Sequence, residues 1–146
     1  MNKIFLLPVF LVAFLFSCNH GNTGGSGIGV SNLDEYSFVM SDSLSSPVAE
    51  GTLTVTDLKD SLISGTYNIS KVYQDQYPGI NTMKGYFSGV YNPVSNKLFL
   101  NMNPKVSDNN VFVKLTIYKS YLGGEWYYST MVGKVSQGYF KANKLN

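Results

Sequence analysis

The sequence offers few residues from which a catalytic or metal site could be built. It contains one cysteine, Cys18, and one histidine, His20, both near the N-terminus. A Ser–His–acid triad, a Cys–His pair or a metal site based on imidazole or thiolate would have to use one of these two residues. No Gly-rich loop leads into a Lys-Ser/Thr helix start, so the sequence has no phosphate-binding loop. We therefore predict a protein that is not an enzyme and that holds no metal or other cofactor.

Carboxylates are the remaining candidates for catalysis, because a glycosidase needs only a pair of them. The chain has nine acidic residues. At predicted strand ends or turns, where solvated acids are usual, lie Asp57, Asp60, Asp75, Asp108 and Glu125. This placement favours a solvated surface role over general acid–base chemistry.

Aromatic residues are the one enriched class of residues, with eleven Tyr, nine Phe and one Trp in the chain. One interpretation is that these rings fill the interior of a small β-structure and form cross-strand pairs. The other is that some line a cavity or its mouth, where rings contact an apolar or sugar ligand and hydroxyls orient it. Residues 124–130 and the connection 73–83 form the predicted rim. The candidate ligand residues are Trp126, Tyr128, Tyr77, Tyr67 and Tyr86. For Trp126 the alternative is that its ring plugs one end of the structure.

The amino-acid composition excludes a largely disordered protein and argues against a nucleic-acid partner. The 146 residues are 44% hydrophobic and only 14% charged, which excludes disorder over most of the chain and fits a single domain. All eleven basic residues are lysines, they are spread along the sequence, and the formal net charge is +2. Nucleic-acid faces normally cluster guanidinium groups, so no nucleic-acid partner is expected.

The N-terminus has the pattern of a secretory signal. Lys3 supplies a positive charge, and residues 4–16 form an apolar run that is too short to span a membrane but suits a signal peptide. The following Leu15-Phe16-Ser17-Cys18 resembles a bacterial lipobox, although Phe16 is larger than the residue usual there. The resemblance implies cleavage before Cys18 and acylation of its sulfur. The alternative is an ordinary secretory signal with an incidental cysteine.

This resemblance to bacterial lipoproteins implies a location and a first partner. The partner is a lipid bilayer, bound through acylated Cys18, since several acyl chains provide stable anchoring. Residues 1–17 would be the signal peptide, 18–32 the lipidated cysteine and a Gly-rich tether, and 33–146 a single domain. Because Asn19 rather than Asp follows the cysteine, the expected location is the cell envelope, on the periplasmic face of the outer membrane.

The body of the chain shows alternation of apolar and polar residues rather than a helical period. Residues 111–118 alternate most cleanly, which predicts Leu115 inward and Thr116 outward. Short turn signals separate the runs, among them Leu122-Gly123-Gly124 and Val132-Gly133-Lys134. The predicted strands are 36–41, 50–57, 65–71, 84–91, 97–103, 111–118, 124–132 and 134–143.

About eight strands joined by short turns predict an all-β, antiparallel meander. Closure into an up-and-down barrel removes exposed edges and is preferred, with a β-sandwich as the alternative. Residues 36–146 are similar to small calycin barrels of the lipocalin-like and avidin-like kinds in their strand order and in repeated Gly-X-Tyr/Phe motifs such as Gly85-Tyr86-Phe87 and Gly138-Tyr139-Phe140. The only Gly-X-Trp, Gly124-Glu125-Trp126, stands late in the chain, so no ligand is transferred from those families.

Two functions are considered, and the first is preferred. The preferred function is a non-enzymatic envelope lipoprotein whose barrel binds a small apolar or amphipathic ligand inside. The second is an interaction or structural module of the envelope, without a ligand pocket, that docks a periplasmic protein with its outer surface or loops. An empty interior would favour the first function. A filled interior and an outward strip of rings such as Phe99, Phe112 and Tyr118 would favour the second.

Overall fold

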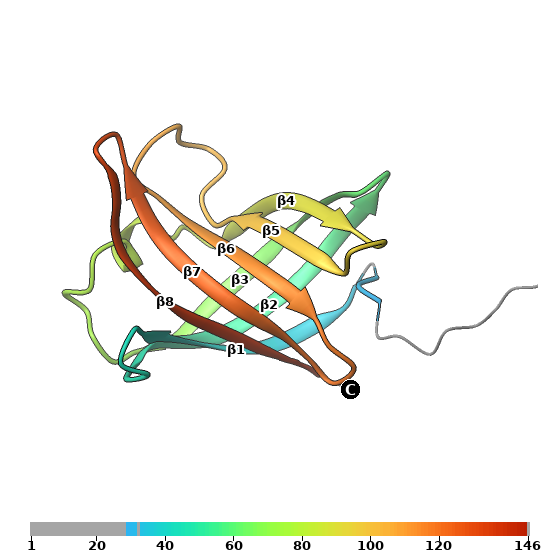
Figure 1. Cartoon of the computed structure of the whole chain (residues 1–146), viewed down its shortest axis with the longest axis horizontal. Helices are drawn as coiled ribbons and strands as arrows, with labels where there is room; N and C mark the ends of the chain where they lie inside the picture. Colours follow the sequence, from blue (N-terminus) through green and yellow to red (C-terminus); the bar gives the residue numbers. More distant parts are fainter. Residues whose placement is uncertain (1–28, 32, 146) are drawn as a thin grey trace, which may run out of the picture.

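A computed structural model describes residues 29–31 and 33–145 and shows an all-β chain with one short 3-10 helix, η1 (Figure 1). In chain order the elements are β1 (Glu35–Asp42), β2 (Pro47–Lys59), β3 (Leu62–Val72), η1 (Ile80–Thr82), β4 (Tyr86–Asn92), β5 (Lys97–Asn101), β6 (Asn110–Ile117), β7 (Tyr121–Thr130) and β8 (Gly133–Lys144). The predicted lipobox with Cys18 and most of the Gly-rich segment lie outside the described residues.

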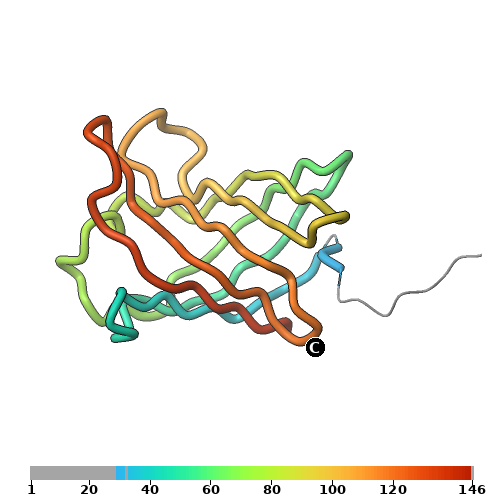
Figure 2. Tube along the Cα trace, viewed as in Figure 1, coloured from blue at the N-terminus to red at the C-terminus, as the bar shows by residue number. Residues whose placement is uncertain are grey.

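The strands form a closed barrel in which every strand pairs antiparallel with its neighbours in sequence (Figure 2). Closure comes from β1, which pairs with β2 on one side and with β8 on the other. Phe38, for example, lies opposite Gly51 of β2 and Ala142 of β8. The predicted antiparallel meander and its closure into a barrel are therefore confirmed over the sandwich alternative.

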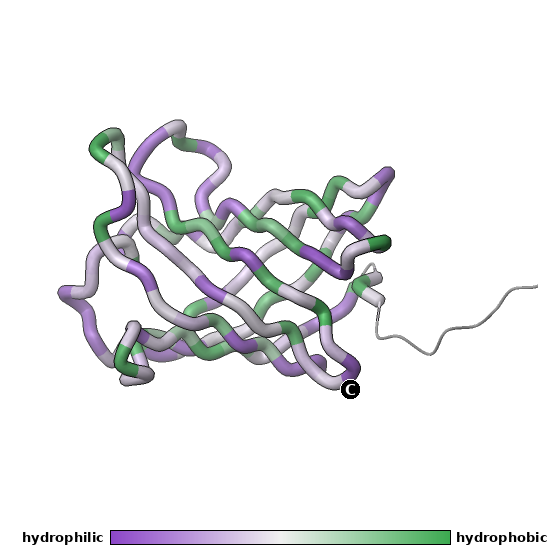
Figure 3. Tube along the Cα trace, viewed as in Figure 1, coloured by the Kyte–Doolittle hydropathy of each residue, from purple (hydrophilic) through white to green (hydrophobic). Residues whose placement is uncertain are grey.

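Alternation along the strands determines which side chains face the interior, and Figure 3 shows hydrophobic and hydrophilic residues alternating along the chain. In β6 the odd-numbered residues Val111 to Ile117 are buried, as predicted, while Thr116 faces outward. The largest inward rings are Tyr36, Phe38, Phe87, Trp126 and Phe140, all with relative exposures of 2% or less. The core therefore lies inside the barrel.

Glycines make room for these rings. Gly51, Gly65, Gly89, Gly124 and Gly138 each occupy a position where an added Cβ would lie 2.0 Å or less from a carbonyl oxygen of the neighbouring strand. Each is opposite a larger inward residue in the pairing; Gly65 is opposite Phe87, and Gly138 is opposite Trp126. Any larger residue would push the strands apart, so glycine is the residue that allows close strand contact beside a bulky side chain.

The pair Gly123-Gly124 corrects one part of the sequence analysis. These residues were predicted to be a turn, but β7 begins at Tyr121 and the turn lies at residues 118–121, closed by the N–H of Tyr118 donating to Tyr121 O. Gly124 lies inside the strand because its missing side chain lets β7 approach Lys114 of β6. The same shift moves Glu125 from the predicted strand end into the exposed outer face of β7. The other predicted turn glycine, Gly133, does have a positive φ of 107°.

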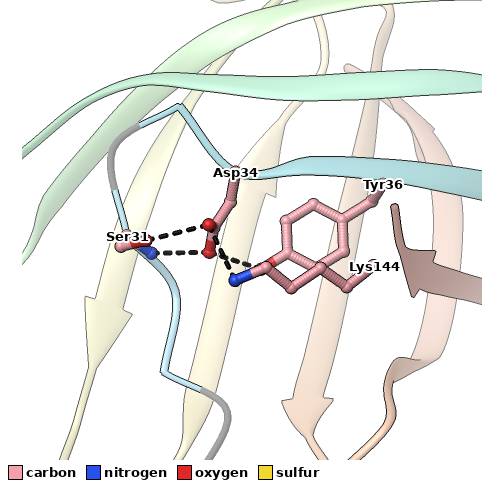
Figure 4. A network of polar contacts seen from close by, with 4 residues as sticks. All are labelled: Ser31, Asp34, Tyr36 and Lys144. Carbon is pink, nitrogen blue, oxygen red and sulfur yellow. Dashed lines mark hydrogen bonds and ion pairs between the residues drawn. The ribbon is translucent and has the colours of Figure 1, made fainter. Parts of the chain in front are cut away.

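Described residues before β1 cover the barrel end at which the C-terminus lies (Figure 1). Val30, placed in the tether by the sequence analysis, is buried in the core. Ser31 donates to Asp34 through its backbone N–H (2.9 Å) and its hydroxyl (2.8 Å). Asp34 also accepts from Tyr36 at 3.1 Å and pairs with Lys144 of β8 at 2.8 Å (Figure 4). This network joins the start of the barrel to its last strand.

The connection between β3 and β4 covers the opposite end. Within it, Ile80 and Met83 are buried in the core. The side-chain amide of Asn103, after β5, donates to Thr82 O at 2.7 Å, and Ser136 of β8 donates to Pro78 O at 3.1 Å. Both ends of the barrel are therefore covered by the chain itself.

Among the described residues, no helix has the length and apolar character needed to cross a membrane.

Candidate functional site

Most of the predicted rim residues pack against other parts of the fold. The indole of Trp126 is fully buried and donates its N–H to Ser41 O at 2.8 Å. Tyr77 meets this indole edge-on, with ring centroids 5.5 Å apart. The ring of Tyr128 packs against Gly79 of the same connection, and its hydroxyl donates to Asn109 at 3.3 Å. The structure thus brings Trp126, Tyr77 and Tyr128 together, but as a packed cluster that joins β7 to the β3–β4 connection.

The other two candidates lie apart from this cluster. Tyr67 is buried in β3 and donates its hydroxyl to Met102 O at 2.7 Å, and burial raises its pKa. Tyr86 faces outward from β4, and Lys105 lies over its ring at 4.2 Å. Burial, followed by the charge of Asp42, also raises the pKa of Tyr77. The raised pKa values of Tyr67 and Tyr77 favour hydroxyls that donate hydrogen bonds, whereas the Tyr86 ring lies on the surface.

The barrel interior is filled. A cavity large enough for water would leave accessible surface on the residues that line it. Inward residues from strands around the barrel have no such surface, since Met40, Val113, Trp126 and Ala142 all have a relative exposure of 0%. With both ends covered as well, the described part of the chain leaves its hollows on the outside.

One of these hollows is an open groove of about 950 Å³ on the outer face of β4 to β8, which we call the outer groove. Strand backbones form its floor, and outward side chains form its sides. Cross-strand pairing arranges these side chains in rows. One row runs Lys97–Thr116–Gly123–Lys141, and the next runs Phe99–Lys114–Glu125–Tyr139, each from β5 to β8.

Aromatic rings line the outer groove and continue beside it. Tyr118 and Tyr121 stack with centroids 4.6 Å apart at one end of it. Phe99, Phe112 and Tyr127 form a stacked column across three strands, with centroids 5.7 and 5.4 Å apart. Phe99, Phe112 and Tyr118, the outward strip considered in the sequence analysis, thus do lie on the outer face.

The opposite side of the barrel has a different character. The outward positions in the middle of β2 and β3 carry small polar side chains, Thr52, Thr54, Thr66 and Asn68 among them. In an eight-stranded closed barrel, β2 and β3 lie four strands away from β6 and β7. The stacked rings of β5 to β7 and the row from Lys97 to Lys141 therefore lie on the side of the barrel away from these small polar residues.

Charge in the outer groove is predominantly positive. Its lining contains three lysines and one glutamate, a formal charge of +2. Lys114 and Glu125 form an ion pair at 3.9 Å with both side chains about half exposed, where such a pair contributes little. Lys97 donates to Thr116 Oγ1 at 2.8 Å, and Lys141 lies 5.1 Å from the centre of the Tyr121 ring. Neither has a carboxylate within 4.0 Å among the described residues.

The buried acid Asp34 was not singled out by the sequence analysis. Burial tends to raise the pKa of its carboxyl, but the hydrogen bonds from Lys144, Ser31 and Tyr36 outweigh this effect and hold the pKa below its ordinary value. All its partners are structural residues at the barrel end. In the described part of the chain no three His, Cys, Asp or Glu side chains gather as metal ligands would.

No known protein family, curated protein or solved structure matches the chain.

Proposed function

We propose that this protein is a non-enzymatic, lipid-anchored module of the bacterial cell envelope that binds its partner with the outer face of its barrel. The anchor would be acylated Cys18, with the outer membrane, periplasmic side, as the location. This part of the proposal is supported by the lipobox-like Leu15-Phe16-Ser17-Cys18. Binding by the outer surface corresponds to the second of the two functions considered from the sequence, and the chemical class of the partner is a separate question.

The observation that carries the choice between these functions is the filled interior. Lipocalin barrels hold a small ligand inside. Here Trp126, Phe38, Phe87 and Phe140 occupy that space, and the chain covers both barrel ends. A ligand inside would have to displace packed rings, whereas the outer groove is open without any rearrangement.

The outer face also has the features of a contact surface. Exposed apolar groups that are contiguous, rather than scattered, mark sites of interaction. Rings of β5, β6 and β7 are contiguous in the stacked column of Phe99, Phe112 and Tyr127. The far side of the barrel, with its threonines on β2 and β3, offers a built-in comparison surface.

Site-specific photo-crosslinking in cells tests this proposal and needs no identified partner. A benzophenone amino acid replaces Tyr139 on β8, which is 56% exposed beside the outer groove. The matched control carries it at Thr66, an exposed position on the opposite side. We expect light-dependent adducts from position 139 and none from position 66. Equal adduct patterns, or none at either position, would contradict binding by the outer face.

The interior-ligand function predicts a different result. Trp126 is the only tryptophan and lies in the filled interior, so its emission reports on any ligand that enters. We expect fatty acids and lipids to leave this emission unchanged. A saturable shift, supported by heat release in calorimetry, would restore the first function.

A further inference from the structure

We propose that the outer groove binds an acidic oligosaccharide, an inference that rests on the proposed function and names the class of its ligand. The site is centred on the row Lys97–Thr116–Gly123–Lys141, with Tyr118, Tyr121 and Tyr139 around it.

The charge of the row selects an anionic ligand. Lys97 and Lys141 stand at its two ends, and neither has a carboxylate within 4.0 Å among the described residues. In the next row the formal charges of Lys114 and Glu125 cancel. A second copy of this chain would bring lysines against lysines, and like charges across a contact are unfavourable. The positive charge of Lys97 and Lys141 therefore favours a negatively charged ligand over a second copy of this chain.

The shape of the row selects an extended ligand. Between the lysines lie Thr116, which is small, and Gly123, which has no side chain. Three strand spacings separate the Lys97 and Lys141 backbones, a span of about 14 Å. The space above this low floor suits a chain of linked units better than one small ion, and the lysine stems can reach inward from both sides.

Aromatic rings and polar groups alternate along the outer groove, which favours a ligand with both apolar faces and polar edges. Tyr139 is 56% exposed, and Tyr118, stacked on Tyr121, is 46% exposed. Thr116 lies in the row between these two groups of rings, and Glu125 lies directly opposite Tyr139 in the strand pairing, so both add oxygens that can form hydrogen bonds. Sugar rings present C–H groups on their faces and hydroxyls at their edges, so they match aromatic surfaces interleaved with polar groups. A carboxylated or sulfated sugar chain adds the negative charge that the lysines require.

The closed barrel argues against an acidic peptide at the same place. Extended peptides commonly bind by adding a strand to a free sheet edge. Here β1 to β8 are each paired on both sides, so the barrel has no free edge to offer. A peptide would be left with side-chain contacts in a shallow groove, whereas a sugar chain needs no backbone pairing.

The test uses the full-length protein in non-ionic detergent and isothermal calorimetry at low salt. The probes are oligogalacturonate, oligoalginate, hyaluronan and chondroitin sulfate, with a neutral maltooligosaccharide and oligoglutamate for comparison. We expect at least one acidic oligosaccharide to bind, the neutral sugar to give no heat, and affinity to fall as salt is added because the ion pairs are exposed.

Two pairs of substitutions locate the site. Lys97→Gln with Lys141→Gln should weaken binding about tenfold, as expected for the loss of two exposed ion pairs. Lys59→Gln with Lys71→Gln removes the same charge from β2 and β3 and should leave affinity unchanged. Tyr139→Ala should also weaken binding if a sugar face contacts its ring.

The outcomes separate this inference from the function on which it rests. No binding by any acidic oligosaccharide, equal losses in the two lysine pairs, or oligoglutamate binding as tightly as the sugars would each overturn the sugar assignment. If photo-crosslinks still form at position 139 in cells, the outer-face function survives that result. If they do not form either, both proposals fail.

Discussion

The indole N–H of Trp126 donates to the carbonyl oxygen of Ser41, 85 residues away in sequence, at 2.8 Å. The two residues belong to β7 and β1, which are separated in the barrel by β8. The indole crosses β8 at Gly138, its partner in the pairing, where any Cβ would lie 1.9 Å from the same Ser41 oxygen. The missing side chain of Gly138 thus lets the Trp126 indole reach β1 and fill part of the barrel interior.

Replacing Trp126 by Phe should destabilise the domain. The smaller ring leaves a void and removes the donor to Ser41, so we expect the free energy of unfolding to fall by about 2–3 kcal/mol. The control is Tyr139→Phe, which removes only an exposed hydroxyl and should change stability by less than about 0.5 kcal/mol. Urea denaturation followed by circular dichroism measures both. Identical midpoints would show that the indole is not part of the core.

Gly138→Ala should destabilise the barrel by at least about 2 kcal/mol, because backbone rather than a flexible side chain meets the new methyl group. Gly29→Ala is the matched control, since nothing lies within 4 Å of a Cβ added there. Thermal unfolding should separate the two variants clearly. A fully stable Gly138→Ala protein would mean that β8 does not approach β1 this closely.

Adjacent residues of β6 should respond oppositely to the same substitution. Leu115→Asp places a carboxylate in the core, which costs several kcal/mol, comparable to the whole stability of a domain of this size. Thr116→Asp places it on the outer face beside Lys97 and should be tolerated. Melting temperatures of the purified variants decide this, and equal values would contradict the inward and outward assignment.

The lowered pKa of Asp34 predicts a specific dependence of stability on pH. Its pKa is lowered in the folded state, so the stabilisation is complete above the ordinary carboxyl pKa and is lost as pH falls through the folded value. At pH 7, Asp34→Asn should reduce stability by roughly 1–2 kcal/mol, because Lys144 is partly exposed and solvent screens the pair.

The difference in free energy of unfolding between wild type and Asp34→Asn should then become smaller in strongly acidic buffer. Urea midpoints at neutral and at strongly acidic pH measure it, with Asp60→Asn in the exposed β2–β3 turn as the control. A difference that stays constant with pH would show that ionisation of Asp34 does not contribute.

Cys18→Ala should release the protein from membranes while leaving the domain folded, because the acyl chains provide the membrane affinity. Cell fractionation should find wild type in the detergent phase and the variant in the soluble phase, both with the same melting temperature. If the variant stays in the membrane pellet, the anchor is not the acylated cysteine.

Much of the fold is determined by local sequence. Alternation in residues 111–118 places Leu115 inside and Thr116 outside, because successive side chains of a strand point to opposite faces. Short turns force neighbouring strands to be antiparallel, and eight such strands close into a barrel.

Other features are decided only by the tertiary structure. The local sequence around Gly123-Gly124 has the composition of a turn, and only packing against Lys114 and Tyr121 shows that both glycines lie within β7. Val30 has no strand pattern, yet it is buried beneath the barrel end.

The interior and the outer groove depend on pairing between residues far apart in the chain. Whether aromatic rings fill a barrel or line its mouth is set by which glycine lies opposite each ring, as Gly138 does for Trp126. The row that joins Lys97 to Lys141 exists because the register of three strand pairs aligns them. Register is a property of the closed sheet as a whole, and a shift of one residue in any pair would turn one of these lysines toward the core.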